Sequence, residues 1–203
     1  MDEEANGLIA SLRQWDARPA SKHGSSVQLI RPQPWRGPSA YLHVLHAGLD
    51  GHGIEELEEV YDRKLPPRLI AFYSAMNGAS LFEDRLTIYG LVRKFSRDPD
   101  VWNPICPSIY VQTFPGLYPR WNSGGFFPIG SLALYSRKAR IACHRTDEII
   151  VFEDEGGELL WRYENIFVAV SMLAAKLRPF WHDDGSLIAG MEMLDSMLGT
   201  GSA

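Results

Sequence analysis

Hydrophobic positions near both ends of the chain recur with helical spacing. Residues 4–16 carry Leu8, Ile9, Leu12 and Trp15 between charged positions, which predicts a short amphipathic helix. Residues 166–177 and 187–198 each carry apolar side chains at i, i+4, i+7 and i+11. This spacing predicts two closing helices, separated by a break at residues 182–185.

Two more helices are predicted on either side of a pair of prolines. The apolar residues of 54–61 share one face, and the glutamates between them face water, with acidic residues in the first turn to complement the helix dipole. The step Leu65-Pro66-Pro67 is expected to end this helix and to begin the next one. That second helix should run to about Met76 and close at Asn77-Gly78, which suits the left-handed conformation.

From residue 86 onward the pattern changes to β-branched and aromatic residues, which favour strands. The predicted strands are Leu86 to Leu91, Phe126 to Tyr135, Ala139 to His144, Glu148 to Phe152 and Glu158 to Tyr163. The last two flank Gly156-Gly157 and should form an antiparallel hairpin. Helices, then consecutive strands, then helices predict an α+β fold, a mainly antiparallel meandering sheet flanked by helices.

The chain is expected to form one domain with extensions. Residues 1–53 should supply the first helix and an extended connector packed on the domain, with an edge strand near Val27 to Ile30 among prolines. The main domain is assigned to residues 54–198, with a long flap at 93–125 that is rich in aromatic residues and proline. Residues 199–203 are expected to be a frayed tail.

Composition narrows the class of partner. The 203 residues have a formal net charge of −5, whereas proteins that bind nucleic acid gather Lys and Arg on one face. No apolar run approaches the roughly 18–20 residues of a membrane span, and the acidic first residues are unlike a signal peptide. We therefore expect a cytoplasmic protein with no nucleic-acid or membrane partner. Cys106 and Cys143 lack CxxC spacing, and we interpret both as reduced thiols.

Motifs that carry catalysis are missing from the sequence. It contains no GxSxG elbow, no Walker loop, no HExxH, no GxGxxG and no calcium loop. Cys143 and His144 are strand neighbours that should point to opposite faces, and His182-Asp183-Asp184 is typical of a turn. The prediction is therefore no catalytic residue, no metal ligand and no cofactor.

The predicted flap is the segment whose composition suggests function. Between residues 94 and 125, prolines alternate with large rings that include Trp102, Tyr110, Tyr118 and Trp121. Long loops in compact domains are often functional, and Trp and Tyr frequently anchor protein interfaces. Aromatic loops also cover sheet faces or edges. The sequence supports both interpretations equally, and they are compatible.

The order of several motifs resembles a known family. Residues 54–58 lead into Leu65-Pro66-Pro67, then Phe72 and Asn77-Gly78, and then Phe127-Pro128-Ile129-Gly130 before the later strands. This order is similar to that of the SUKH superfamily, which includes Smi/Knr-type regulators of cell-wall synthesis and bacterial immunity proteins against toxins. The resemblance covers roughly residues 54–177 and departs from the family pattern in the first 50 or so residues and in the long flap.

The resemblance implies a non-catalytic protein-binding domain, either an immunity protein that neutralises a toxin or a regulatory adaptor. A basic toxin domain would suit the acidic chain. The candidate partner-binding residues are Trp102, Tyr110, Tyr118, Trp121, Trp161, Asp154 and Glu155. The sheet face with Trp161 and Tyr163 is a second candidate surface. The alternative function is a small-molecule-binding protein or enzyme with a pocket between flap and sheet.

Overall fold

The computed structural model describes residues 3–15, 21–23, 27–37, 40–93, 124–154 and 157–188. Its elements are, in chain order, α1 (Glu3–Arg13), β1 (Ser21–His23), β2 (Val27–Pro32), β3 (Tyr41–Ala47), α2 (Gly51–Tyr61), α3 (Pro67–Ala75), β4 (Met76–Leu81), β5 (Leu86–Ile88), β6 (Phe126–Ala133), β7 (Lys138–His144), β8 (Ile149–Glu153), β9 (Leu159–Tyr163), α6 (Ile166–Leu177) and the 3-10 turn η1 (Arg178–Phe180).

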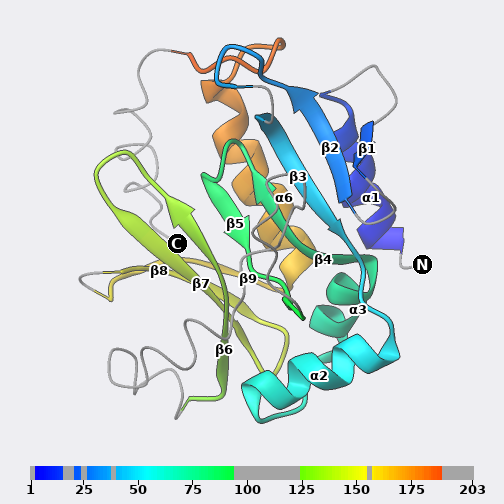
Figure 1. Ribbon diagram of the computed structural model, residues 1–203. Helices are drawn as coiled ribbons and strands as arrows, with labels where there is room; N and C mark the ends of the chain where they lie inside the picture. The colour runs from blue at the N-terminus through cyan, green and yellow to red at the C-terminus, as the bar shows by residue number, and fades with distance from the viewer. Residues whose placement is uncertain are drawn as a thin grey trace.

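A single meandering sheet organises these elements. Its nine strands lie in the order of the sequence, from β1 to β9, and each strand pairs antiparallel with the next. Figure 1 shows the chain passing from strand to strand across the molecule. The prediction of an α+β fold with a meandering antiparallel sheet is confirmed, and so is the β8–β9 hairpin, where Gly157 adopts a positive φ of 65°.

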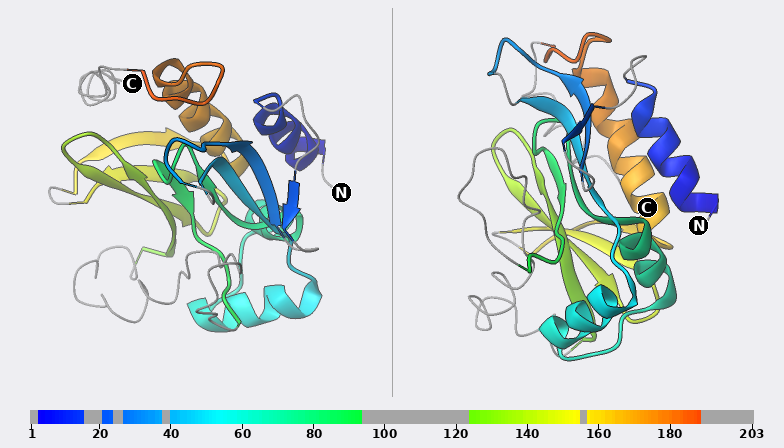
Figure 2. Two further views of the ribbon diagram at one scale, coloured as in Figure 1. Left: turned by 45° about the horizontal axis from the view of Figure 1, so that its top comes forward. Right: turned by 45° about the vertical axis from the view of Figure 1, so that its right-hand side comes forward.

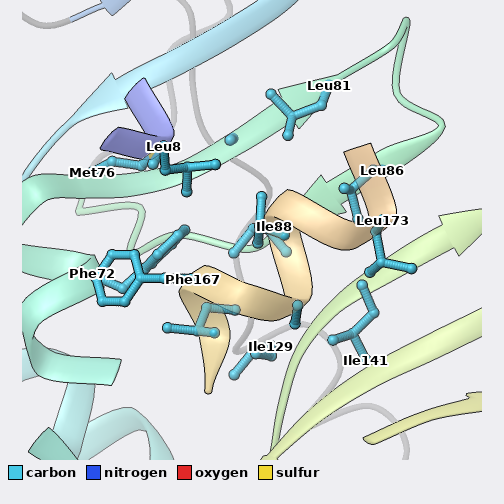
Figure 3. Packing of buried hydrophobic residues seen from close by; sticks show 14 of the residues in the cluster. Leu8, Phe72, Met76, Leu81, Leu86, Ile88, Ile129, Ile141, Phe167 and Leu173 are labelled. Carbon is cyan, nitrogen blue, oxygen red and sulfur yellow. The ribbon is translucent and has the colours of Figure 1, made fainter. Parts of the chain in front are cut away.

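Helices α1 and α6 lie side by side on one face of the sheet (Figure 2). The largest hydrophobic cluster joins these helices and α3 to the strands. In Figure 3, Leu173 of α6 points toward Ile141 of β7, and Phe167 of α6 lies beside Phe72 of α3. Ile88 and Ile129, from β5 and β6, belong to the same cluster. Six of the twelve α6 residues are buried, so this helix is a central part of the core and depends on tertiary burial for its stability.

The end of α3 differs from the sequence prediction. Instead of closing at Asn77-Gly78, the helix passes directly into β4, a strand that the sequence did not predict. The Asn77 side chain pairs with the backbone of Leu91, accepting from Leu91 N at 2.7 Å and donating to Leu91 O at 2.9 Å. Gly78 has a φ of 86°, and a Cβ on Gly90 would lie 2.1 Å from Asn77 O. Asn77 and Gly78 therefore allow the backbone at residues 77–78 to pass in close contact with the backbone at residues 90–91.

Both ends of α2 were also predicted wrongly. The helix begins at Gly51, where Asp50 accepts a hydrogen bond from Gly53 N at 2.8 Å, so its first turn holds no acidic residue. It ends at Tyr61 because Asp62 adopts a left-handed conformation, with φ at 52°, before the prolines are reached. The start of the next helix at Pro67 is confirmed. The predicted boundary after residue 53 lies inside α2.

Several other strands and helices depart from the predictions. Strand β3 was not predicted, and β2, predicted as an edge strand, pairs on both sides, with β1 and with β3. Strand β5 ends at Ile88, three residues before the predicted end at Leu91. Leu187, predicted to begin the last helix, forms an isolated bridge with Trp181. The remainder of that predicted helix, the tail, and nearly all of the flap lie outside the described residues.

The N-terminus of α3 is capped from a distant turn. Pro66, the residue before the helix, provides no side-chain cap. The carboxylate of Asp147, in the β7–β8 turn, instead accepts hydrogen bonds from Arg68 N at 3.0 Å and Leu69 N at 3.3 Å. These N–H groups have no partner within the helix. The contact therefore ties the turn to α3 across 79 positions of the sequence.

We expect replacement of Asp147 to destabilise the protein through loss of this cap. Because Asp147 has a φ of 71°, Asp147→Gly removes the acceptor without adding backbone strain. It should lower the free energy of unfolding by about 1 kcal/mol. Asp147→Asn keeps an acceptor oxygen and is the matched control, expected to retain most of the stability. Urea denaturation followed by circular dichroism measures both; equal stability of the two variants would contradict the cap.

Candidate functional site

The structure describes two of the seven residues predicted to bind a partner. Trp161 lies in β9, and Asp154 directly follows β8. Trp102, Tyr110, Tyr118, Trp121 and Glu155 lie outside the described residues. The candidate site is therefore built from the sheet end that carries Trp161 and from the cavities and side chains of the described chain.

Trp161 stands at the end of the sheet. It pairs in register with Val151 of β8, and β9 is the last strand in the sheet order. The indole is half-buried and packs against the main core. Lys176 of α6 places its ammonium 5.2 Å from the ring centroid, within range of a cation–π attraction. One part of the ring is thus fixed by the fold, and the remainder is accessible.

Exposed apolar side chains lie on the two elements that hold Trp161. Leu159 of β9 is 43% exposed, and Met172 of α6 is 49% exposed. Met172 lies one helical turn before Lys176, so the two residues share a flank of α6. We refer to Leu159, Trp161, Met172 and Lys176 as the β9–α6 edge. Within β9 itself, Arg162 forms an ion pair with Glu148 at 2.8 Å.

Asp154 has a different role from Trp161. Its carboxylate accepts two hydrogen bonds from Arg140, at 3.0 and 2.8 Å, in a largely buried pair. Arg140 also donates to the Tyr89 hydroxyl at 3.2 Å. Burial alone would lower the pKa of Arg140, but the hydrogen bonds with Asp154 raise it above its usual value. Asp154 therefore holds the β7–β8 hairpin through Arg140, whereas Trp161 pairs with Lys176.

A cavity of about 550 Å³, open to solvent along much of its length, lies between α1 and α6. We call it the α1–α6 cavity. Most of the residues along its two helical walls are small or polar, and larger side chains gather near the C-terminal ends of both helices. Its lining residues are Gly7, Ser11, Leu12, Gln14, Trp15, Phe82, Ser171, Ala174, Ala175, Arg178 and Asp183.

Arg178 is one of the two charged residues that line this cavity, together with Asp183. Its guanidinium carbon lies 4.0 Å from the centroid of the Trp15 ring. The same group donates to Trp181 O at 2.9 Å and to the Asp183 carboxylate at 2.5 Å. The Asp183 side chain is 94% exposed. Stacking and the bond to the carbonyl fix the guanidinium, while the bond to Asp183 is screened by water.

His43, Phe82 and Trp181 lie behind Trp15 in a cluster of rings. The His43 ring lies 5.8 Å from Trp15 and 4.7 Å from Phe82, and Phe82 lies 5.0 Å from Trp181. His43 is fully buried, and its Nδ1 accepts a hydrogen bond from Phe82 N at 3.2 Å. Burial lowers the pKa of His43 to about 3. The imidazole is therefore neutral, with its proton on Nε2.

The sequence carries a signal for this cavity that lies outside the predictions made above, which place Trp15 in the core stripe of the first helix and Asp183 in a turn. Small residues recur four positions apart on both helices, at Gly7 and Ser11 and at Ser171 and Ala175. Two such stripes leave space between the helices when they lie opposite one another. Whether they do so depends on the tertiary structure, which a single sequence does not reveal.

No group of three or more His, Cys, Asp or Glu side chains among the described residues is arranged to hold a metal ion. Cys143 is a buried free thiol, and burial raises its pKa; Cys106 lies outside the described residues. None of the described helices has the length and apolar character needed to span a bilayer. The chain matches no protein-family model, and no curated protein matches it.

We expect His43 to make stability depend on pH. The unfolded chain binds a proton near pH 6.5, whereas folded His43 stays neutral until about pH 3, so the free energy of unfolding falls as the pH falls between these values. Between pH 7 and pH 5 the loss from this group should be about 2 kcal/mol. His43→Asn keeps an acceptor for Phe82 N and should flatten the profile by that amount.

Denaturant unfolding of the wild type and the variant at pH 7, 6 and 5 measures the difference. His46, whose pKa burial lowers to about 4, is present in both proteins and cancels in the comparison. His52→Asn is the control, because the His52 ring is exposed. An unchanged pH slope in His43→Asn would show that His43 takes up its proton in the folded state.

Proposed function

We propose that this chain is a non-catalytic protein-binding domain that holds its partner at the β9–α6 edge. The observation that carries the proposal is a half-buried Trp161 on the last strand of the sheet, with the exposed Leu159 on the same strand and the exposed Met172 on the adjoining helix α6. Tryptophan is the side chain most often found among residues that dominate binding energy. A ring already fixed by the core loses little conformational entropy when a partner covers it.

The strand that carries Trp161 also supports this proposal. Within the described residues β9 pairs with β8 alone, so its outer side offers backbone N–H and C=O groups to an added strand. Natural edge strands are usually protected by charged residues or proline. The five residues of β9 include one charge, Arg162, which is engaged by Glu148. An extended segment of another protein fits such an edge.

The class of partner follows from the resemblance and the charge. Resemblance to the SUKH superfamily supports an immunity protein or a regulatory adaptor acting in the cytoplasm. The net charge of −5 favours a basic partner such as a toxin domain, because charge of opposite sign accelerates the encounter of two proteins. The β9–α6 edge would then provide the short-range contacts that slow dissociation.

Site-specific photo-crosslinking in the protein's native cells tests the location. A benzoylphenylalanine at position 159 or 172 should crosslink to one and the same protein. The same residue at position 55, on the exposed face of α2, is the control and should not give this adduct. Adducts of equal yield from all three positions, or none from 159 and 172, would contradict binding at this edge.

Substitution of Trp161 then tests the contribution of the ring. Trp161→Ala should weaken binding of the crosslinked partner by at least tenfold, because the buried aromatic contact is lost, while Trp161→Phe should retain most of the affinity. Trp35→Ala is the matched control: Trp35 is 53% exposed but lies in the β2–β3 connection. Surface plasmon resonance on folded variants measures the effect, and equal loss in the two alanine variants would contradict the assignment.

A further inference from the structure

We propose that the α1–α6 cavity binds a small organic carboxylate with an apolar body, with Arg178 holding the carboxylate and Trp15 and Phe82 contacting the apolar part. This site is separate from the β9–α6 edge and does not depend on the proposed protein partner. Its volume of about 550 Å³ falls within the roughly 300–1,000 Å³ of small-molecule sites.

The walls of the cavity suit the apolar part of such a ligand. Gly7 and Ser11 of α1 line one wall, and Ala174 and Ala175 of α6 line the other. A Cβ placed on Gly7 would meet no atom within 4 Å, so the space in front of this glycine is open. Small side chains on both helices thus leave a channel that an alkyl or aryl group can occupy.

Arg178 supplies a cationic hydrogen-bond donor at the Trp15 end of the cavity. Arg178 presents a guanidinium held in place by Trp15 and Trp181 O. His43 and Trp181 lie behind the lining rings and do not line the cavity, so the recognition of an anion rests on Arg178. A carboxylate matches a guanidinium in charge and in the spacing of its two oxygens.

Nearby carbonyl groups would not repel a carboxylate strongly, because cations already bind them. Trp181 O accepts from Arg178, and Trp15 O accepts from Arg31 at 3.5 Å. The acidic group that remains is Asp183, which occupies one guanidinium nitrogen from a highly exposed position. A ligand carboxylate can replace Asp183 with little cost, because an exposed ion pair contributes little to stability.

Isothermal titration of the full chain with hexanoate, octanoate and decanoate tests the proposal. One saturable site is expected, with affinity rising roughly two- to fourfold for each added CH₂ as the apolar chain fills the channel. Decan-1-ol has the same tail without the charge and should bind at least tenfold more weakly than decanoate. Heat from 4-phenylbutanoate would show whether a ring also fits.

Two variants locate the site by independent routes. Arg178→Gln removes the charge and should weaken decanoate at least tenfold; Arg162→Gln, on β9, is the matched control and should bind as the wild type does. Gly7→Leu fills the channel and should abolish binding. Gly7→Ala is its control, because it also raises the helix propensity of α1 but adds only one methyl group to the channel. Because leucine and alanine both favour helix over glycine, neither change should impair folding.

The proposal would be overturned by two results. The first is the absence of saturable binding for all four carboxylates at 5 mM with folded wild-type protein. The second is binding that Arg178→Gln and Gly7→Leu both leave unchanged, which would place the ligand elsewhere. Neither result bears on crosslinking from position 159, so the two proposals stand or fall separately.

Discussion

The burial of α6 is the constraint on which the rest of this structure depends. An apolar helix of twelve residues has to remove Ile166, Phe167, Val170, Leu173 and their buried neighbours from water, and the meandering sheet provides the surface. The helix then divides into three flanks. One is buried in the sheet, one carries Met172 and Lys176 beside β9, and one carries Ser171 and Ala175 toward α1, with Arg178 of η1 directly after the helix. The β9–α6 edge and the α1–α6 cavity therefore lie on the two flanks of α6 that the sheet does not bury.

The two ends of the described chain meet beside α6. The β2–β3 segment holds the loop after η1 through Gln33, which donates to Gly185 O at 2.7 Å, and through Arg31, which donates to Asp184 O at 2.7 Å. Gly185 has a φ of 86°, and a Cβ there would lie 2.9 Å from Arg31 Cγ. This loop carries Asp183, and the turn after α1 carries Trp15. The α1–α6 cavity is therefore assembled by contacts between residues about 150 positions apart.

Local patterns predicted the elements whose neighbours are close in sequence. The strands from residue 138 to 163 and the helix at 166–177 follow from alternation, from a glycine turn and from helical spacing, because each pairs with the element beside it. Strand β4 was missed because Asn77-Gly78 is typical of a helix end, whereas the Asn77 side chain bonds to the backbone of Leu91, 14 positions away. The cap on α3 by Asp147 and the cavity were missed for the same reason: each depends on residues brought together by the whole sheet.

Charge illustrates the limit of composition as a guide to function. Asp154 is a predicted partner-binding residue, yet it pairs with Arg140 at 2.8 Å, and its neighbour Glu153 pairs with Arg137 at 3.2 Å. Ion-paired carboxylates produce little field beyond the Debye length of about 8 Å. Attraction of a basic protein must then come from the net charge of the whole chain, which acts on the rate of encounter. The lifetime of a complex would depend on Trp161 and its apolar neighbours, so salt should affect association far more than dissociation.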